Sequence, residues 1–270
     1  MTGGLVDALC HLDDPRAGDL GALLARAADA GVTDVISAGT DPEADAFEIP
    51  GATHPRVRVW RAFGVHPRAV REGALPRQLR ALDDLLSLPG VVALGECGLD
   101  GRAGMPPLEL QEDALRAQLA VARERALPVV LHHVRATERF LRILEEGGPL
   151  PAGGMLHGYT GAPELLPRLL AVGLSISFGG LVSRPRTKRA HASARAVPRE
   201  RLLAESDAPD HPPAGTPDGP SEPAQLPVTL RALAGLRGEP YDELAAATAA
   251  NARRLFFLPT GPHDAPDFAC

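Results

Sequence analysis

Short apolar runs typical of buried strands alternate with segments of helical periodicity along almost the whole chain. This alternation constrains the fold more than any other feature, because a strand followed by a helix returns the chain so that the next strand runs parallel to the first. Eight strand-like runs can be distinguished, at residues 5–7, 32–37, 57–63, 91–94, 128–131, 155–157, 174–178 and 201–206. A helix-like segment is expected after each, most clearly at 108–126, 164–171 and 241–257.

Eight strand–helix units in about 250 residues are the size of one closed barrel. The pattern therefore predicts the α/β class and a single-domain (β/α)8 TIM barrel, with a doubly wound open sheet as the alternative. No internal repeat or low-complexity linker divides the chain. We expect one domain over residues 1–260 and a C-terminal tail at 261–270.

Composition limits the cellular setting. The chain is 44% hydrophobic and 23% charged, as in globular proteins, and no apolar run approaches the ~20 residues that span a bilayer. The start lacks the basic segment of a secretory signal, and Cys10, Cys97 and Cys270 cannot form an even set of disulfides. We expect a cytoplasmic monomer with reduced thiols. A net charge of −6 argues against a nucleic-acid coat protein but allows an enzyme with local basic residues.

One carboxylate lies where a buried strand should end. The stretch 91–100 reads VVALGECGLD, in which the apolar run stops at Gly95 and Glu96 follows. Taken alone, Glu96 is more often a solvated loop acid than a functional group. Other strand-like runs, however, end in the same way.

The polar residues at strand ends form a set that suits a metal. In a barrel these side chains converge on one mouth, where the active site lies. Imidazole and carboxylate ligands suit Zn, Mn, Co or Mg, so the set predicts a hydrolytic site with a divalent metal, as one or two ions. Its members are Asp7, His11, His66, Glu96, His132, His157 and Asp207.

The sequence resembles the TatD family of metal-dependent deoxyribonucleases, within the wider group of amidohydrolase-like barrels. The resemblance implies a two-metal site in which Glu96 bridges the ions and takes part in catalysis. It also implies that His132 and His157 bind one metal and Asp207 the other. The matching stretches run in order, at 5–14, 63–67, 93–100, 111–132, 155–180, 201–209, 221–227 and 251–258.

The chain departs from the family at one ligand position. The family pattern D-x-H-x-H corresponds here to Asp7-Ala8-Leu9-Cys10-His11, so Leu9 stands where the first histidine is expected. Alternation along a strand places residues 7, 9 and 11 on one side. Leucine cannot bind a metal. We therefore predict one tight metal held by Glu96, His132 and His157, with the second, near His11 and Asp207, weak or absent.

Four further residues have expected roles beside the metals. The resemblance implies that His66 lies near the substrate phosphate, although a loop histidine stiffened by Pro67 is nearly as plausible. Glu205 and Asp7 are expected to contact the metal-binding side chains without binding the metal themselves. His133 follows His132 directly and should face away from the metals, which favours a hydrogen bond or a substrate contact over a ligand role.

The implied chemistry is hydrolysis of a phosphodiester by a metal-activated water, with Asp207 as ligand and proton acceptor. The DNA substrate would meet cations in the acid-free run 181–199, where Arg184 and Arg186 are the expected substrate-binding residues. Seven of the prolines fall within 209–227, which predicts a stiff loop over the mouth.

Three functions remain open from the sequence. The first is a 3′→5′ deoxyribonuclease acting on short or single-stranded DNA, as the family suggests. The second is hydrolysis of another ester or amide, as in deacylases or lactonases, since 4% aromatic content offers few stacking platforms for bases. The third is a binding protein in which Leu9 has abolished catalysis.

Overall fold

The computed structural model describes residues 4–46, 48–49 and 51–259. The expected C-terminal tail at 261–270, with Cys270, lies outside the described residues. Among the described helices, none combines the length and the apolar character needed to cross a membrane.

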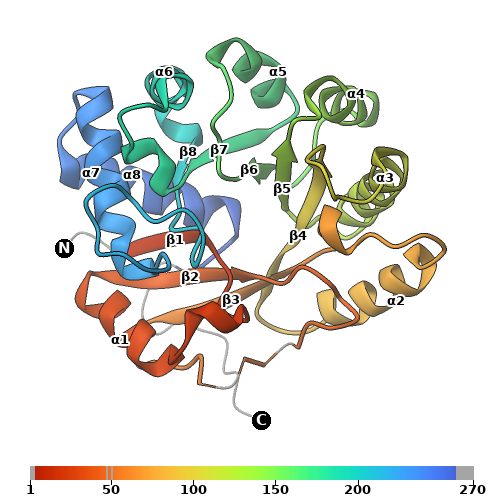
Figure 1. Ribbon diagram of the computed structural model, residues 1–270, viewed down its shortest axis with the longest axis horizontal. Helices are drawn as coiled ribbons and strands as arrows, with labels where there is room; N and C mark the ends of the chain where they lie inside the picture. The colour runs from red at the N-terminus through yellow and green to blue at the C-terminus, as the bar shows by residue number, and fades with distance from the viewer. Residues whose placement is uncertain (1–3, 47, 50, 260–270) are drawn as a thin grey trace.

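Eight strands form one sheet whose spatial order follows the order in the chain (Figure 1). Every neighbouring pair is parallel. The strands are β1 Leu5–Cys10, β2 Val32–Ala38, β3 Arg58–Phe63, β4 Val91–Asp100, β5 Val129–Val134, β6 Gly154–Leu156, β7 Leu174–Phe178 and β8 Leu202–Ala204.

The sheet closes where the first strand meets the segment after the last. Cys10 and Ala208 form a parallel bridge, the amide of His11 donates to Ala208 O at 2.7 Å, and the amide of Asp207 donates to Leu9 O at 3.0 Å. Below this seam, Asp7 accepts hydrogen bonds from the amide (2.8 Å) and hydroxyl (2.5 Å) of Ser206. The predicted (β/α)8 barrel is confirmed, and the open sheet is excluded.

Helices surround the barrel (Figure 1). They are α1 Leu20–Asp29, α2 Leu75–Leu86, α3 Leu108–Glu124, α4 Thr137–Gly147, α5 Leu166–Ala171, α6 Lys188–Ala196, α7 Leu226–Arg237 and α8 Tyr241–Leu255. The expectation of a helix after every strand was wrong once. In the described part of the connection between β2 and β3 the chain forms turns and no helix.

Most buried apolar side chains form two layers. The larger cluster lies between the sheet and the helices and includes Phe63, Leu115 and Phe140. A second cluster fills the barrel and includes Leu9, Trp60, Ala62, Val130, Met155 and Leu203, with Phe256 from the end of α8. The interior is therefore packed, and space for a ligand is left at the ends of the barrel.

Candidate metal and catalytic site

A cavity of about 300 Å³ lies at the carboxyl ends of the strands. It is the one into which the predicted ligands project. Its lining includes His11, His66, Glu96, His132, His157 and Asp207, together with Thr40, Arg68, Arg102, His133, Thr160, Leu181 and His211. We call it the catalytic pocket.

Glu96 is the centre of this pocket and is 2% exposed. Its Oε1 lies 2.7 Å from Nδ1 of His132, 2.8 Å from Nε2 of His157 and 3.5 Å from Nε2 of His66. Its Oε2 lies 3.4 Å from Nε2 of His11. Burial alone raises the pKa of Glu96, but the surrounding imidazoles outweigh it and hold the pKa well below the ordinary value.

Two glycines allow Glu96 and His132 to lie side by side. A Cβ on Gly95 (φ +146) would come within 2.4 Å of Val130 O, and one on Gly98 (φ +154) within 1.9 Å of His132 O. Only glycine therefore permits this approach of β4 to β5. The expectation that the strand ends at residue 94 was wrong, because β4 continues through Glu96 to Asp100.

The tautomer of His11 suits a ligand. Its Nδ1 lies 2.9 Å from the carbonyl of Ala38, which can only accept, so Nδ1 carries the proton. The lone pair of Nε2 is then directed towards Glu96 and towards Oδ1 of Asp207, 3.9 Å away. A backbone carbonyl that fixes the ring in this way is common behind metal-binding histidines.

His66 has the opposite tautomer. Its Nδ1 accepts the amide hydrogen of Arg68 at 3.0 Å, which leaves the proton on Nε2, the atom that faces Glu96. Burial lowers the pKa of His66 to about 4, so the ring is neutral near pH 7. Neutral and protonated at Nε2, His66 can donate a hydrogen bond but has no free lone pair for a metal.

Carboxylates flank the other two histidines. Asp100 Oδ2 lies 3.2 Å from Nε2 of His132, and Glu205 Oε1 lies 3.6 Å from Nδ1 of His157. Glu205 is fully buried, accepts the amide hydrogen of Gly158 at 2.6 Å, and leaves Oε2 without a partner. Burial lowers the pKa of both imidazoles, but Asp100 and Glu96 outweigh it at His132, and Glu96 and Glu205 outweigh it at His157, so both pKa values are raised.

Asp207 lies opposite Glu96 and is 6% exposed. Its Oδ1 is 3.9 Å from His11 and 4.0 Å from Nδ1 of His157. Burial raises the pKa of Asp207 to about 7. A buried carboxylate of this kind is stabilised by a nearby cation, and the donor set fits a divalent ion.

The described residues contain two groups of three side chains that could each hold a metal. Within each group, the potential ligand atoms lie within 4.8 Å of one another. The first group is His66, Glu96 and His132, and the second is His157, Glu205 and Asp207. The tautomer of His66 argues against its place in the first group.

Leu9 contributes no polar atom to this set. It is fully buried and packs in the cluster inside the barrel. The register of β1 shifts between Asp7 and Cys10, so simple alternation does not hold along this strand. Asp7 turns to Ser206 across the seam, and His11 enters the catalytic pocket.

The other predicted residues, of which His133 alone lines the catalytic pocket, contact groups other than Glu96. The ring of His133 packs on Phe140 with centroids 5.0 Å apart, and its buried Nε2 has no partner. Arg184 donates to Pro212 O at 3.0 Å, and Arg186 lines a separate hollow at the start of α6. Neither arginine lines the catalytic pocket.

Two arginines that were not predicted from the sequence, Arg68 and Arg102, line the catalytic pocket. Arg68 donates to Thr40 Oγ1 at 3.0 Å, and Arg102 forms a bidentate pair with Asp100. A signal was present in the sequence, because each arginine follows a strand-end residue by two positions, His66 and Asp100. Burial raises the pKa of Asp100, but His132 and Arg102 lower it well below the ordinary value.

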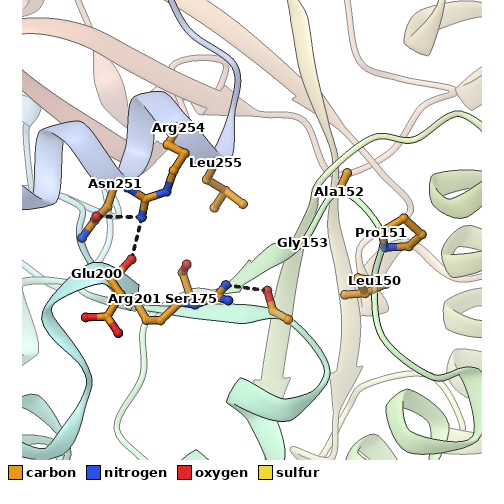
Figure 2. Close-up of a pocket in the computed structure, with 11 residues that line it drawn as sticks. Leu150, Pro151, Ala152, Gly153, Ser175, Glu200, Arg201, Asn251, Arg254 and Leu255 are labelled. Carbon is orange, nitrogen blue, oxygen red and sulfur yellow. Dashed lines mark hydrogen bonds between the residues drawn. The ribbon is translucent and has the colours of Figure 1, made fainter.

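A second cavity, of about 400 Å³, lies at the other end of the barrel (Figure 2). Residues that precede β6, β7 and β8 line it together with the end of α8. Ser175, Arg201, Asn251 and Arg254 project around it, and it contains no histidine. Its lining offers one carboxylate, Glu200, against the cluster of histidines and carboxylates in the catalytic pocket, so we place the chemistry in the catalytic pocket.

A closed parallel barrel with a buried histidine and carboxylate cluster at its carboxyl end defines the class of metal-dependent hydrolases. The chain belongs to the family of TatD related DNases, whose model matches residues 6–257.

Relatives agree with this assignment. The chain is 38% identical over 239 residues to the 3'-5' ssDNA/RNA exonuclease TatD of Erwinia billingiae, covering 87% of this chain and 91% of the relative. It is 34% identical over 256 residues to the uncharacterized metal-dependent hydrolase YjjV of Escherichia coli, covering 94% and 98%. The crystal structure of YjjV superposes with a TM-score of 0.87 at 33% identity, covering 96% of this chain and 100% of that one.

Proposed function

We propose that this protein is a divalent-metal-dependent phosphodiesterase that removes nucleotides from the 3′ end of single-stranded DNA or RNA. The observation that carries the proposal is the position of Glu96 among His11, His132 and His157, with Asp207 opposite. The exonuclease name of the Erwinia relative supports the substrate class.

Glu96, His132 and His157 would hold the tight ion, and Glu96, His11 and Asp207 a weaker one. A bound cation would acidify water and offset negative charge on the phosphate. The weaker metal position lacks one ligand, because Leu9 stands where the family pattern has a histidine. The metal could be Zn, Mn, Co or Mg, and imidazole-rich sites favour the transition metals.

The chain's own residues would complete the reaction. Asp207 faces the pocket from the side opposite Glu96 and would accept the proton of the attacking water. His66, protonated at Nε2, would donate a hydrogen bond to a phosphate oxygen. Arg68 and Arg102 line the same pocket and would attract the phosphate, while Glu205 would hold His157 in place.

The substrate can be tested with metal analysis and one labelled oligonucleotide. The purified protein should contain at least one divalent ion per chain and should shorten a 5′-labelled single-stranded DNA in steps of one nucleotide. Chelation should stop the reaction. Full activity after complete metal removal would contradict the proposal. Turnover of lactones or acylated amino acids without cleavage of the oligonucleotide would favour a deacylase or lactonase, and metal binding without turnover would favour a binding protein.

We also propose that the hydrolase domain occupies residues 1–260 and acts as a cytoplasmic monomer. The chain has three cysteines, an odd number that cannot form an even disulfide framework. Light scattering during size-exclusion chromatography would test the oligomeric state, since a dimer would elute with twice the 28.3 kDa mass of the chain.

A further inference from the structure

Cations without partners gather at the start of α6. Among the basic side chains in the described part of the chain, only a few make no hydrogen bond, ion pair or ring contact. They are Arg80, Arg135, Arg186, Lys188 and Arg189. Most other arginines are neutralised locally, as Arg168 is by Glu145 at 2.6 Å. Three of these five cations, Arg186, Lys188 and Arg189, lie within four consecutive residues. In a protein of net charge −6, this concentration of unpaired positive charge distinguishes the segment from the rest of the described surface.

These three cations line one hollow. Arg186, Lys188 and Arg189 surround a space of about 350 Å³ together with Thr160, Thr187 and Ala190, and we call it the α6 pocket. No carboxylate lines it. Such a pocket attracts an anion, and its three cations are exposed to solvent and free to reorient.

The backbone adds to the positive potential. The residues of the hollow include the first turn of α6, whose amide groups have no side-chain cap. The hydroxyl of Thr187 is engaged instead with the carbonyls of Leu181 and Arg184. The uncapped amides and the helix dipole therefore act in the same direction as the three cations.

The α6 pocket adjoins the catalytic pocket. Thr160 is exposed, lies three residues after His157 and lines both hollows. Leu181, at the start of the run that carries Arg186, also lines the catalytic pocket. A chain-like anion with one phosphate beside Glu96 can therefore continue across Thr160 towards α6.

We propose that the α6 pocket binds a backbone phosphate of the substrate strand other than the one being cleaved. This inference rests on the proposed nuclease function and narrows it to substrates with more than one phosphate. Contacts to phosphate carry no base specificity, so the pocket would position any sequence. Its contribution is to affinity and to the salt dependence of binding.

The test measures binding separately from hydrolysis. Fluorescence anisotropy of a labelled single-stranded octanucleotide would be recorded against salt, in a Glu96→Gln background that prevents cleavage. In this background Lys188→Ala with Arg189→Ala should raise Kd about tenfold. It should also reduce the slope of log K against log salt by about 1.4, or roughly 0.7 for each cation removed.

A matched pair of cations provides the control. Arg80→Ala with Arg254→Ala removes the same charge from α2 and from the cavity at the other end of the barrel (Figure 2). This pair should leave Kd within twofold. Equal weakening by both pairs, no weakening by the α6 pair, or no binding of the octanucleotide at all would overturn the inference. Tight, α6-dependent binding by a protein that cleaves no nucleic acid would retain the α6 pocket and reject the nuclease function.

Discussion

Nε2 of His157 lies 2.8 Å from Oε1 of Glu96, although Glu96 lies on β4 and His157 directly follows β6, and these two strands do not pair with each other. His132 lies on β5 between them and contacts the same oxygen at 2.7 Å. One carboxylate thus unites three strand ends, and its charge compensates imidazoles on both sides. The properties of the whole cluster depend on this charge.

Glu96→Gln should remove bound metal and lower kcat/KM by at least about 10³-fold. An amide keeps the size of the side chain but supplies neither the negative charge nor the bridging oxygens that a divalent ion requires. Metal analysis and the oligonucleotide assay measure both effects. Glu164→Gln, at an exposed position, is the control and should behave like the unmodified protein. Retention of metal and activity by Glu96→Gln would place the site elsewhere.

Leu9→His should increase the amount of divalent metal per chain, because it supplies the imidazole that the weaker position lacks. The substituted side chain lies at a fully buried position of β1, two residues before His11. Leu9→Phe introduces a ring without a ligand atom and should leave the metal content unchanged. Elemental analysis after equilibrium dialysis distinguishes the two variants. Equal stoichiometry in all three proteins would contradict the idea that Leu9 limits metal binding.

His66→Ala should reduce kcat/KM by about 10²-fold without changing the metal content, because the side chain donates from Nε2 and offers no lone pair there. His66→Gln can place an amide N–H near the same point and should recover part of the activity. Loss of one metal ion in His66→Ala would identify the residue as a ligand and refute the tautomer assigned to it.

Gly98→Ala should lower the melting temperature by several degrees or prevent folding, because the new methyl group would lie 1.9 Å from His132 O. Gly104→Ala is a close comparison. That residue also has a positive φ (+87), but nothing lies within 4 Å of the added carbon. It should cost only about 1 kcal/mol of backbone strain. Thermal unfolding followed by circular dichroism would compare the two, and similar losses would show that crowding at β5 is unimportant.

Asp34→Asn should destabilise the fold by roughly 3–5 kcal/mol, because it leaves two guanidinium groups near the barrel base without their counter-charge. Asp34 is fully buried and accepts from Arg58 at 2.7 Å, Trp60 at 3.0 Å and Arg253 at 3.0 Å. Asp29→Asn, which breaks only the exposed pair with Arg56, should cost less than about 1 kcal/mol. Urea unfolding at pH 7 measures both.

The same carboxylate has a defined pH dependence. Burial raises the pKa of Asp34, but the hydrogen bonds from Arg58 and Trp60 outweigh it and lower the pKa below 3.8. Its stabilisation is therefore complete above about pH 4, the unfolded value, and is lost as the pH falls through the folded pKa. The difference in unfolding free energy between Asp34→Asn and the unmodified protein should shrink below pH 4. A difference that is constant down to pH 2 would contradict the ion pair.

The strand order and several site residues followed from local signals. Apolar runs that end in His132, His157 or near Asp207 identify strand ends without any knowledge of distant contacts, and the parallel barrel then brings them together. The end of β4 could not be found in this way. Gly95 and Gly98 resemble breakers in the sequence, whereas in the fold they admit the backbone of β5.

Other features depend on contacts between distant segments. The opposite tautomers of His11 and His66 are set by Ala38 O and by the amide of Arg68, and no pattern in the chain encodes them. The register shift in β1 turns Asp7 away from the site towards Ser206, against simple alternation. Unpaired cations such as Lys188 can be recognised only when the partners of the other basic side chains are known.

The seam between Asp7 and Ser206 joins residues 199 positions apart. During synthesis the first strand therefore cannot form its contacts with the last segment of the barrel until that segment has been made. His11 cannot face Asp207 until nearly the whole domain has left the ribosome. A chain that terminates between residues 157 and 206 would carry Glu96, His132 and His157 but neither the seam nor Asp207. The order of the chain thus delays the complete cluster until translation is almost finished.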